Sequence, residues 1–420
     1  MSKFLLTGIA LFALVLLGFR FQSFYASQPV YVDAEVVSLH VTLQETPEFS
    51  NKGQKFRIKT KTNQYIHVTT TAFPVYHFGE VLQIEGTIEA RDLETHTIYV
   101  MIKPEITVLS EAQNPLMGAA GSLRRDVQAL YEDALPPISA SLLMGIIFGS
   151  REHFPDDFWE ALQVTGVMHV IAASGMNVTF VSAALLFTFG RIMRRQVALL
   201  LGMVGIVFYL FLVGFEPSIL RASIMGLLAF GASLLGKQHY AVYAILVTAY
   251  GMLFWQPSYI NDVGFQLSFL ATLGIIFLKP LFPIRENAFT EAITTTLAAQ
   301  LGTLPILFGV FGQVGLVSLL VNAITLWTIP VIMLFGSIGG IIGLFIPFLG
   351  KLLLFGTIPF LSYFAAVVQF FGGYAGLIVF DSWHWTLTVG YYLLLLSWLL
   401  FKKPKQQALS LEESLSIDRY

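Results

Sequence analysis

Two hydrophobic patterns divide the chain. Beyond residue 139, long apolar runs follow one another with short polar breaks, whereas residues 29–112 alternate polar and apolar positions and are rich in Val, Thr, Tyr and Ile. Apolar runs of roughly 20 residues are typical of helices that cross a bilayer, and alternation with period two is typical of strands. The pattern predicts a polytopic α-helical membrane protein with a small all-β domain near its N-terminus.

The predicted spans differ in length. They cover residues 139–148, 176–192, 197–213, 218–235, 241–254, 263–278, 289–310, 316–335, 338–348, 352–371 and 386–400. Two of them, 139–148 and 338–348, are much shorter than the roughly 20 residues that a crossing needs, and such segments are tolerated only inside protein or beside water. We therefore expect half-spanning or re-entrant helices.

Five regions follow from these patterns. Residues 1–28 form a first transmembrane helix, which we prefer to a signal peptide because no clear cleavage site follows. Residues 29–112 form the β domain, 113–138 an amphipathic helix in the membrane interface, 139–401 the membrane domain and 402–420 a tail. Lys and Arg gather in alternate short loops and after residue 401, which predicts a cytoplasmic C-terminus and a β domain outside, provided that 338–348 re-enters.

Composition narrows the range of functions. Hydrophobic residues make up 55% of the 420 residues and charged residues 12%. The net charge of −2 gives no whole-chain attraction for nucleic acid, and the absence of cysteine excludes thiolate chemistry. The eight histidines lack metal-ligand spacing, and no phosphate-binding G-x-x-x-x-G-K-[ST] motif occurs. We expect no cofactor, no catalytic metal and no enzymatic activity.

Strands are predicted near residues 30–42, 54–61, 65–71, 81–89 and 97–109, which favours an OB-like barrel. In the segment 54–61 every second residue is a cation, so the cations project from one face. They are Lys55, Arg57, Lys59 and Lys61; Lys52 precedes them, and Tyr65 follows with a ring on which a base would stack. This row of like charges favours a polyanion such as nucleic acid, with a solvated strand face as the alternative.

A polar break interrupts the apolar pattern at residues 169–180, H-V-I-A-A-S-G-M-N-V-T-F. His169, Ser174 and Asn177 place polar groups at membrane depth, where such groups usually face protein or water. Gly175 lets the backbone bend or a neighbour approach closely. A packed helix–helix contact and a pore or ligand site both remain open.

Further polar side chains lie in the later spans. Arg221 must pair, snorkel or line water, and Glu216 and Asp262 are its expected acidic partners. The other polar residues are Gln266, Ser268, Gln300 and Asn322. Hydrogen bonding between helices explains each of them alone, and together they favour a polar cavity.

Five segments carry such residues in a fixed order. They are M-G-I-I-F-G-S-R at 144–151, T-G-V-M-H-V-I-A-A-S-G-M at 165–176, P-S-I-L-R-A-S-I-M at 217–225, D-V-G-F-Q-L-S-F-L-A at 262–271 and Q-L-G-T-L-P at 300–305. The series resembles the ComEC-type competence protein family, the inner-membrane DNA channels of natural transformation. The β domain matches the family's OB-like domain in position.

The resemblance implies a channel that carries single-stranded DNA across the bacterial cytoplasmic membrane. The residues expected to line it are His169, Ser174, Asn177, Arg221, Gln266, Ser268, Gln300 and Asn322. DNA would bind outside at Lys52, Lys55, Arg57, Lys59, Lys61 and Tyr65. An external DNA receptor and a cytosolic helicase-like motor are the partners that the family implies.

Two departures from the family pattern matter. The family's S-G-x-H reads S-G-M-N here, so Asn177 stands at the histidine position and proton titration there is in doubt. Many members also end in a metallo-β-lactamase-like domain, whereas this chain stops at Tyr420 without an H-x-H-x-D-H run. We therefore expect no nuclease activity in this chain, and either a separate nuclease or a truncated variant of the family.

Two other functions compete with the DNA channel. A small-solute or ion transporter with an external docking domain would also use Arg221. An intramembrane hydrolase would pair Ser174 with His169, but five residues separate them, so in one continuous helix they would lie on different faces. Binding of DNA by the β domain discriminates the channel from the transporter.

Overall fold

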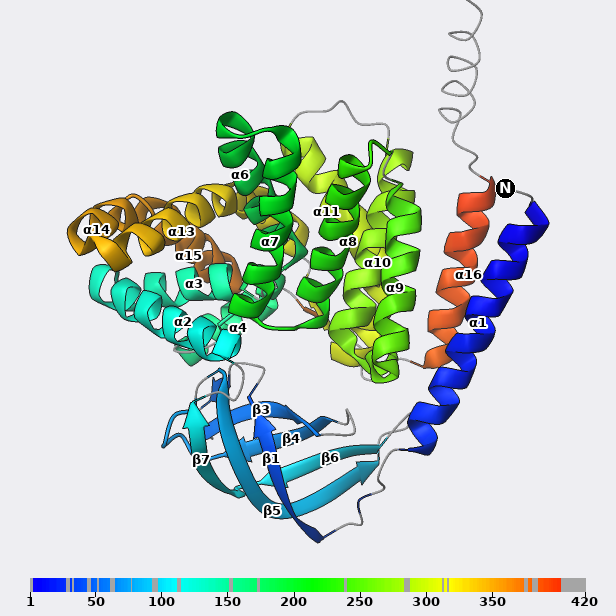
Figure 1. Ribbon diagram of the computed structural model, residues 1–420, viewed down its shortest axis with the longest axis horizontal. Coiled ribbons are helices and arrows are strands. Elements are labelled where there is room, and N and C mark those ends of the chain that lie inside the picture. Colours follow the sequence, from blue (N-terminus) through cyan, green and yellow to red (C-terminus); the bar gives the residue numbers. More distant parts are fainter. Residues whose placement is uncertain are drawn as a thin grey trace, which may run out of the picture.

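The computed structural model describes residues 3–27, 31, 34–43, 47–50, 53–60, 65–76, 78–92, 97–111, 115–150, 154–171, 174–237, 240–282, 288–311, 313–315, 317–373, 377–379 and 384–401. Figure 1 shows a β domain at one end of a large helical domain, with α1 (Lys3–Ala26) along its outside.

The β domain contains β1 (Glu35–Thr42), β2 (Glu48–Ser50), β3 (Gly53–Lys59), β4 (Tyr65–Thr70), β5 (Glu80–Asp92), β6 (Thr97–Ile102) and β7 (Glu105–Glu111). The long strand β5 pairs with β1, β6 and β7, and β4 pairs with β3 and, in parallel, with β6. Because β1 also lies against β3, the sheet curls into the predicted OB-like barrel. Leu43, Ile58, Ile66, Leu82 and Met101 fill its core.

One predicted strand is wrong. The segment 97–109 forms two strands, because the chain turns at Lys103, where φ is +51°, and the next residue is Pro104. Proline has no N–H to continue a ladder. The short strand β2 was also absent from the prediction.

The helical domain contains α2 (Pro115–Ala134), α3 (Pro137–Phe148), α4 (Asp156–Val164), α5 (Met168–Ile171), α6 (Gly175–Ile192), α7 (Arg195–Val213), α8 (Pro217–Leu234), α9 (Ala241–Trp255), α10 (Val263–Leu278), α11 (Ala288–Phe311), α12 (Ser318–Thr325), α13 (Ile329–Phe345), α14 (Pro347–Phe355), α15 (Ile358–Gly372) and α16 (Trp385–Phe401). Three short 3₁₀ turns, η1 (Pro257–Asn261), η2 (Lys279–Leu281) and η3 (Leu326–Thr328), and a two-stranded pair, β8 (Gln313–Gly315) with β9 (Leu377–Val379), complete it.

Six helical segments in the described part of the chain are long and apolar enough to cross a membrane, or seven if α14 and α15, bent by 43°, form one span. The predicted short segment 338–348 is wrong, because α13 runs unbroken through most of it. The break lies earlier, at η3, within the predicted span 316–335. The segment 338–348 therefore adds no crossing separate from the one that α12 and α13 form together.

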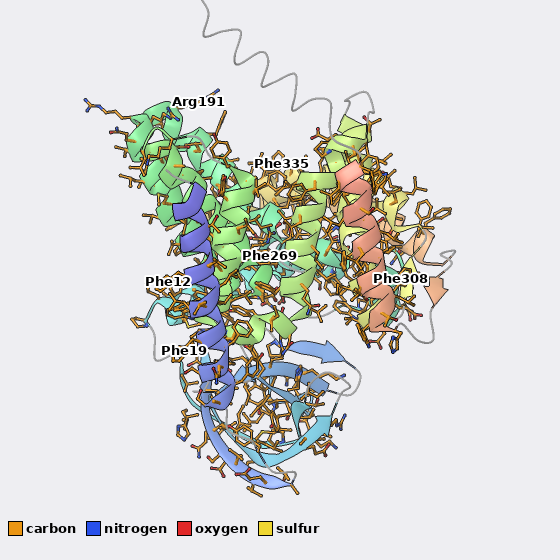
Figure 2. The ribbon with its side chains drawn as sticks, turned by 90° about the vertical axis from the view of Figure 1, so that its right-hand side faces the viewer. Phe12, Phe19, Arg191, Phe269, Phe308 and Phe335 are labelled. Carbon is orange, nitrogen blue, oxygen red and sulfur yellow. The ribbon has the colours of Figure 1, made fainter. Side chains whose placement is uncertain are left out.

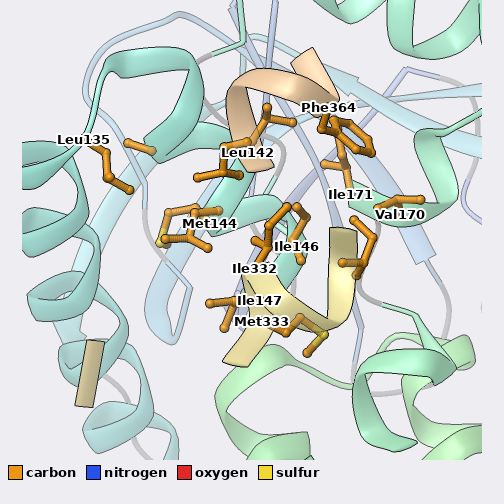
Figure 3. Packing of buried hydrophobic residues seen from close by; sticks show 14 of the residues in the cluster. Leu135, Leu142, Met144, Ile146, Ile147, Val170, Ile171, Ile332, Met333 and Phe364 are labelled. Carbon is orange, nitrogen blue, oxygen red and sulfur yellow. The ribbon is translucent and has the colours of Figure 1, made fainter. Parts of the chain in front are cut away.

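The main hydrophobic core lies around α3. Nine of its twelve residues are buried, which is typical of a helix enclosed on all sides. Leu142 and Ile146 of α3 pack with Ile171, Ile332 and Phe364 from α5, α13 and α15 (Figure 3). The helix α2 joins this core, and its Tyr131 hydroxyl donates to Gly336 O at 2.9 Å.

Candidate functional site

The segment 169–180 folds as a break between two helices. After α5 the backbone is extended at Ser174, and α6 starts at Gly175. Asn177 Nδ2 donates to Ile146 O at 2.6 Å, and the Tyr209 hydroxyl donates to Ile147 O at 2.8 Å. Both carbonyls lie in the last turn of α3, where a helix has no internal donors left. Asn177 is 1% exposed, so a helix–helix contact accounts for it.

Arg221 reaches from α8 to α10 and to the start of α6. Its Nε donates to Ser268 Oγ at 2.6 Å and its Nη1 donates to Thr272 Oγ1 at 2.7 Å. A Cβ atom at Gly175 would lie 2.9 Å from Nη2, so the missing side chain of glycine is what lets the guanidinium approach α6. Three of the segments that the sequence singles out therefore meet at one arginine.

This site lies deep among the helices. The Arg221 guanidinium carbon is 5.9 Å from the centroid of the Phe269 ring, and Phe269 lies about midway along the helices in Figure 2. Arg221 stands only in the second turn of α8, but its long side chain carries the charge toward the middle of the domain.

The charge of Arg221 has no carboxylate beside it in the described part of the chain. Its partners are the two hydroxyls, the Phe269 ring and the Met225 sulfur at 3.7 Å. The expected partner Asp262 binds Arg57 instead, so that prediction is wrong. A half-buried cation held only by neutral groups keeps its attraction for an anion.

A second polar group surrounds α12. Gln300 Nε2 donates to Ser318 Oγ at 2.7 Å, and Asn322 lies one turn after Ser318. Gly166, with φ +70°, packs directly against this helix, since a Cβ there would lie 2.6 Å from Ser318 Cβ. His169 Nδ1 is 3.1 Å from Gly166 O. Five of the predicted lining residues thus fall into two groups, and the segment 165–176 contacts both: Arg221 with Ser268, and His169, Gln300 and Asn322 around α12.

Other residues define the edges of the site. Gln266 belongs to neither group: it is half-buried, and its Nε2 donates to Ile260 O at 2.8 Å. Thr272 and Tyr209 were missed from the sequence. The position of Thr272, four residues after Ser268, could have revealed it, because both then lie on one helix face. Nothing in the sequence marked Tyr209.

Small residues bring α10 and α11 together beside the site. A Cβ at Gly274 would lie 2.4 Å from Ala298 O, and one at Gly302 would lie 2.5 Å from Leu270 O. Within α11, Pro305 cannot donate to Leu301 O, four residues earlier. The Tyr391 hydroxyl of α16 donates to that carbonyl at 2.7 Å.

The basic strand keeps its predicted alternation. Phe56 and Ile58 of β3 are buried, whereas Lys55 is exposed and Arg57 half-buried. On the neighbouring strand β4, Thr69, His67 and Tyr65 pair with Lys55, Arg57 and Lys59, and the Arg57 guanidinium lies 5.4 Å from the centroid of the Tyr65 ring. Lys52, Lys61 and the Lys59 side chain lie outside the described residues. We call Lys55, Arg57, Tyr65 and His67 the β3–β4 face.

This face adjoins the helical domain. Arg57 Nη1 lies 3.1 Å from Asp262 Oδ2, and the Asp262 side chain is only 11% exposed. The other oxygen of Asp262 accepts from Phe265 N at 2.8 Å and so caps α10. The β domain therefore contacts the helix that carries Ser268 and Thr272.

The fold is that of a polytopic membrane protein with an extramembrane β domain, and the half-buried Arg221 lies among its helices. Residues 146–405 match the family described as Competence protein, and the chain belongs to this family. In the described part of the chain, no group of three His, Asp or Glu side chains gathers as a metal site.

Similar proteins cover parts of the chain. ComE operon protein 3 of Bacillus subtilis is 29% identical over 53% of this chain and 29% of its own length. An uncharacterized protein of Aquifex aeolicus is 30% identical over 39% of each chain. Uncharacterized protein YcaI of Escherichia coli is 24% identical over 50% of this chain and 31% of its own. The chain thus matches less than half the length of these relatives, and no solved structure matches it.

Proposed function

We propose that this chain is a channel-type protein of the bacterial cytoplasmic membrane that carries single-stranded DNA into the cell during natural transformation. Its membership of the Competence family and its similarity to ComE operon protein 3 support a role in DNA uptake. The observation that carries the proposal is the Arg221 charge, which only neutral partners hold between α6, α8 and α10.

A phosphodiester backbone suits this arrangement. Each nucleotide brings one negative charge, and phosphate contacts carry no sequence information, so one arginine would serve every passing nucleotide. A fixed carboxylate beside Arg221 would neutralise it and repel the backbone. Ser174, Ser268 and, farther along, His169, Gln300 and Asn322 would complete the polar lining, with Gln266 at its margin.

The β3–β4 face would receive the DNA before it reaches Arg221. In OB-like barrels the face of the second and third strands commonly binds oligonucleotides. If the three-residue strand β2 is left out of the count, β3 and β4 are the second and third strands of this barrel. Lys55 and Arg57 would contact phosphates, and Tyr65 offers a ring for stacking. The contact between Arg57 and Asp262 supports a path from this face toward α10.

Orientation and partners are part of the same proposal. Figure 2 shows Arg191 at the end of the helices opposite the β domain, which fits a cytoplasmic end there and a β domain outside. An external DNA receptor would deliver the strand and a cytosolic helicase-like motor would draw it in. We assign no catalytic step to the chain, and a separate nuclease would degrade the strand that is not imported.

The test uses the full-length protein. In nanodiscs, binding of a fluorescent single-stranded oligonucleotide is measured over a salt series. In proteoliposomes, uptake of the oligonucleotide is compared with uptake of labelled inorganic phosphate. Arg221→Ala should weaken binding and abolish oligonucleotide uptake.

Arg20→Ala is the matched control, because Arg20 also binds only neutral groups, the carbonyls of Phe254 and Trp255, but on the outside of α9. It should behave as wild type. Oligonucleotide uptake that persists in Arg221→Ala contradicts the channel site. Uptake of phosphate without oligonucleotide would instead identify a small-solute transporter.

A further inference from the structure

The side chain of Asn322 has an unmet acceptor. Asn322 is 2% exposed on α12, and in the described part of the chain its Oδ1 is enclosed without a hydrogen-bond donor. Buried polar atoms nearly always have a partner, so an orphaned carbonyl oxygen needs a bound group that supplies a donor hydrogen or positive charge, such as water or a cation.

A second oxygen lies on the same face of α12. Ser318 is one turn before Asn322 and is 6% exposed, so the two side chains are neighbours on the helix surface. Ser318 Oγ accepts from Gln300 Nε2 at 2.7 Å, which occupies one of its two lone pairs. The hydrogen bond from Gln300 fixes the hydroxyl and leaves the other lone pair for a ligand.

The helix around these residues passes through a 3₁₀ turn without a sharp bend. The helix α12 ends at Thr325, the turn η3 follows, and α13 begins with a proline in its first turn. Together these elements make one membrane-length segment, Ser318–Phe345. Asn322 stands in the turn of α12 that directly precedes η3. A 3₁₀ stretch inside a longer helix often marks a functional hinge or local strain.

We propose that Asn322 Oδ1 and Ser318 Oγ bind a monovalent cation of the size of Na⁺, with water completing its shell. The donors are neutral oxygens, whereas divalent cations usually take carboxylates. An anion would meet the negative end of the amide carbonyl dipole. The site is separate from the Arg221 group and takes a ligand of opposite charge to DNA.

Occupation of this site would affect the segment 165–176. Gly166 lies directly over Ser318, and its carbonyl is held by His169. The same segment ends at Gly175 beside Arg221. A cation that orders α12 would therefore also order the segment that approaches the arginine, which gives an ion gradient a route to the proposed channel.

The experiment measures thermal unfolding of the full-length protein in nanodiscs, with NaCl replaced stepwise by choline chloride at constant ionic strength. The melting temperature should rise with Na⁺ and saturate, because a ligand that binds only the folded state stabilises it. Asn322→Leu should lose this rise and melt higher than wild type in choline chloride, since it removes the orphaned oxygen. Ser318→Ala removes one of the two protein ligands. It should therefore raise the Na⁺ concentration that gives half of the melting-temperature rise by about tenfold.

Two further variants keep the test decisive. Ser223→Ala is the matched control, because Ser223 Oγ on α8 is likewise buried without a hydrogen-bond partner in the described residues, and it should keep the full response. Asn322→Asp keeps the shape and adds charge, and it should bind Na⁺ more tightly. Equal melting in NaCl and choline chloride means that water alone fills the site and overturns the proposal. A Na⁺ response that survives Asn322→Leu overturns it as well. Neither outcome bears on DNA uptake.

Discussion

Arg57 and Asp262 form an ion pair of 3.1 Å although 205 residues separate them in the chain. Arg57 belongs to the β3–β4 face, and Asp262 caps the helix α10, whose Ser268 and Thr272 hold Arg221. The pair thus joins the proposed DNA-receiving face to the helix that positions the deep arginine. A phosphate arriving at Arg57 would compete with Asp262 for the same guanidinium.

The two partners of this pair should contribute unequally to the free energy of unfolding. Arg57→Ala loses a partly exposed ion pair and should lower the free energy of unfolding by less than about 1 kcal/mol. Asp262→Ala also loses the cap of α10 and should cost roughly 1 kcal/mol more. Melting of the single and double variants in nanodiscs measures both terms. Equal losses for the two single variants would contradict a capping role for Asp262.

The β3–β4 face should govern the salt dependence of DNA binding. Lys55→Ala should lower the slope of log affinity against log salt by about 0.7, the value for one phosphate contact on a single strand. Arg91→Ala is the control, because Arg91 lies on β5 and pairs locally with Glu89. Anisotropy of a labelled oligonucleotide with the full-length protein gives both slopes. An unchanged slope in Lys55→Ala would remove the face from the proposal.

Arg221 should be required for function but not for stability. Arg221→Met keeps the length of the side chain and removes a charge that neutral groups compensate poorly, so the melting temperature should be unchanged or higher. Oligonucleotide uptake should nevertheless be lost, and Arg221→Lys should retain part of it. If Arg221→Met instead unfolded the protein, the arginine would be a structural residue.

The contact between α10 and α11 should tolerate no side chain at Gly274. A Cβ there would meet the backbone oxygen of Ala298 at 2.4 Å, so Gly274→Ala should lower the free energy of unfolding by about 1–3 kcal/mol. Gly251→Ala on α9 is the control, since a Cβ at Gly251 meets nothing within 4 Å, and it should be neutral or stabilising by up to ~1 kcal/mol. Equal melting of the two variants would show that the helices can separate freely.

Asn177 should stabilise the junction of α3 and α6. Asn177→Ala leaves Ile146 O without its donor and should cost about 1–3 kcal/mol. Ser182→Ala is a mild comparison, because the Ser182 hydroxyl bonds only to Val178 O in its own helix. Thermal melting distinguishes the two. A harmless Asn177→Ala would return the residue to the set proposed to line the channel.

Elements that depend on local pattern alone could be predicted from the sequence. The span 263–278 is confirmed to the residue as α10, and the alternation of Lys55, Phe56 and Arg57 on β3 is confirmed, because side-chain direction follows directly from the period of a helix or strand. The five ordered segments also indicated the family. The pattern failed where a local turn interrupts an element. It did not predict the turn at Lys103 between β6 and β7, or the 3₁₀ turn η3 within the predicted span 316–335.

Which side chains meet could not be predicted from local pattern, because it depends on the packing of the whole domain. The sequence predicted Asp262 as a partner of Arg221, but in the fold Asp262 pairs with Arg57. Arg221 instead donates hydrogen bonds to Ser268 and Thr272 and lies beside Gly175, where no side chain blocks its approach. The fold also separated the predicted lining residues: Ser268 lies at Arg221, Gln300 lies at α12, and Gln266 lies at neither. Such choices depend on how helices cross and how closely small residues let them approach, and these are properties of the packed domain rather than of any one segment.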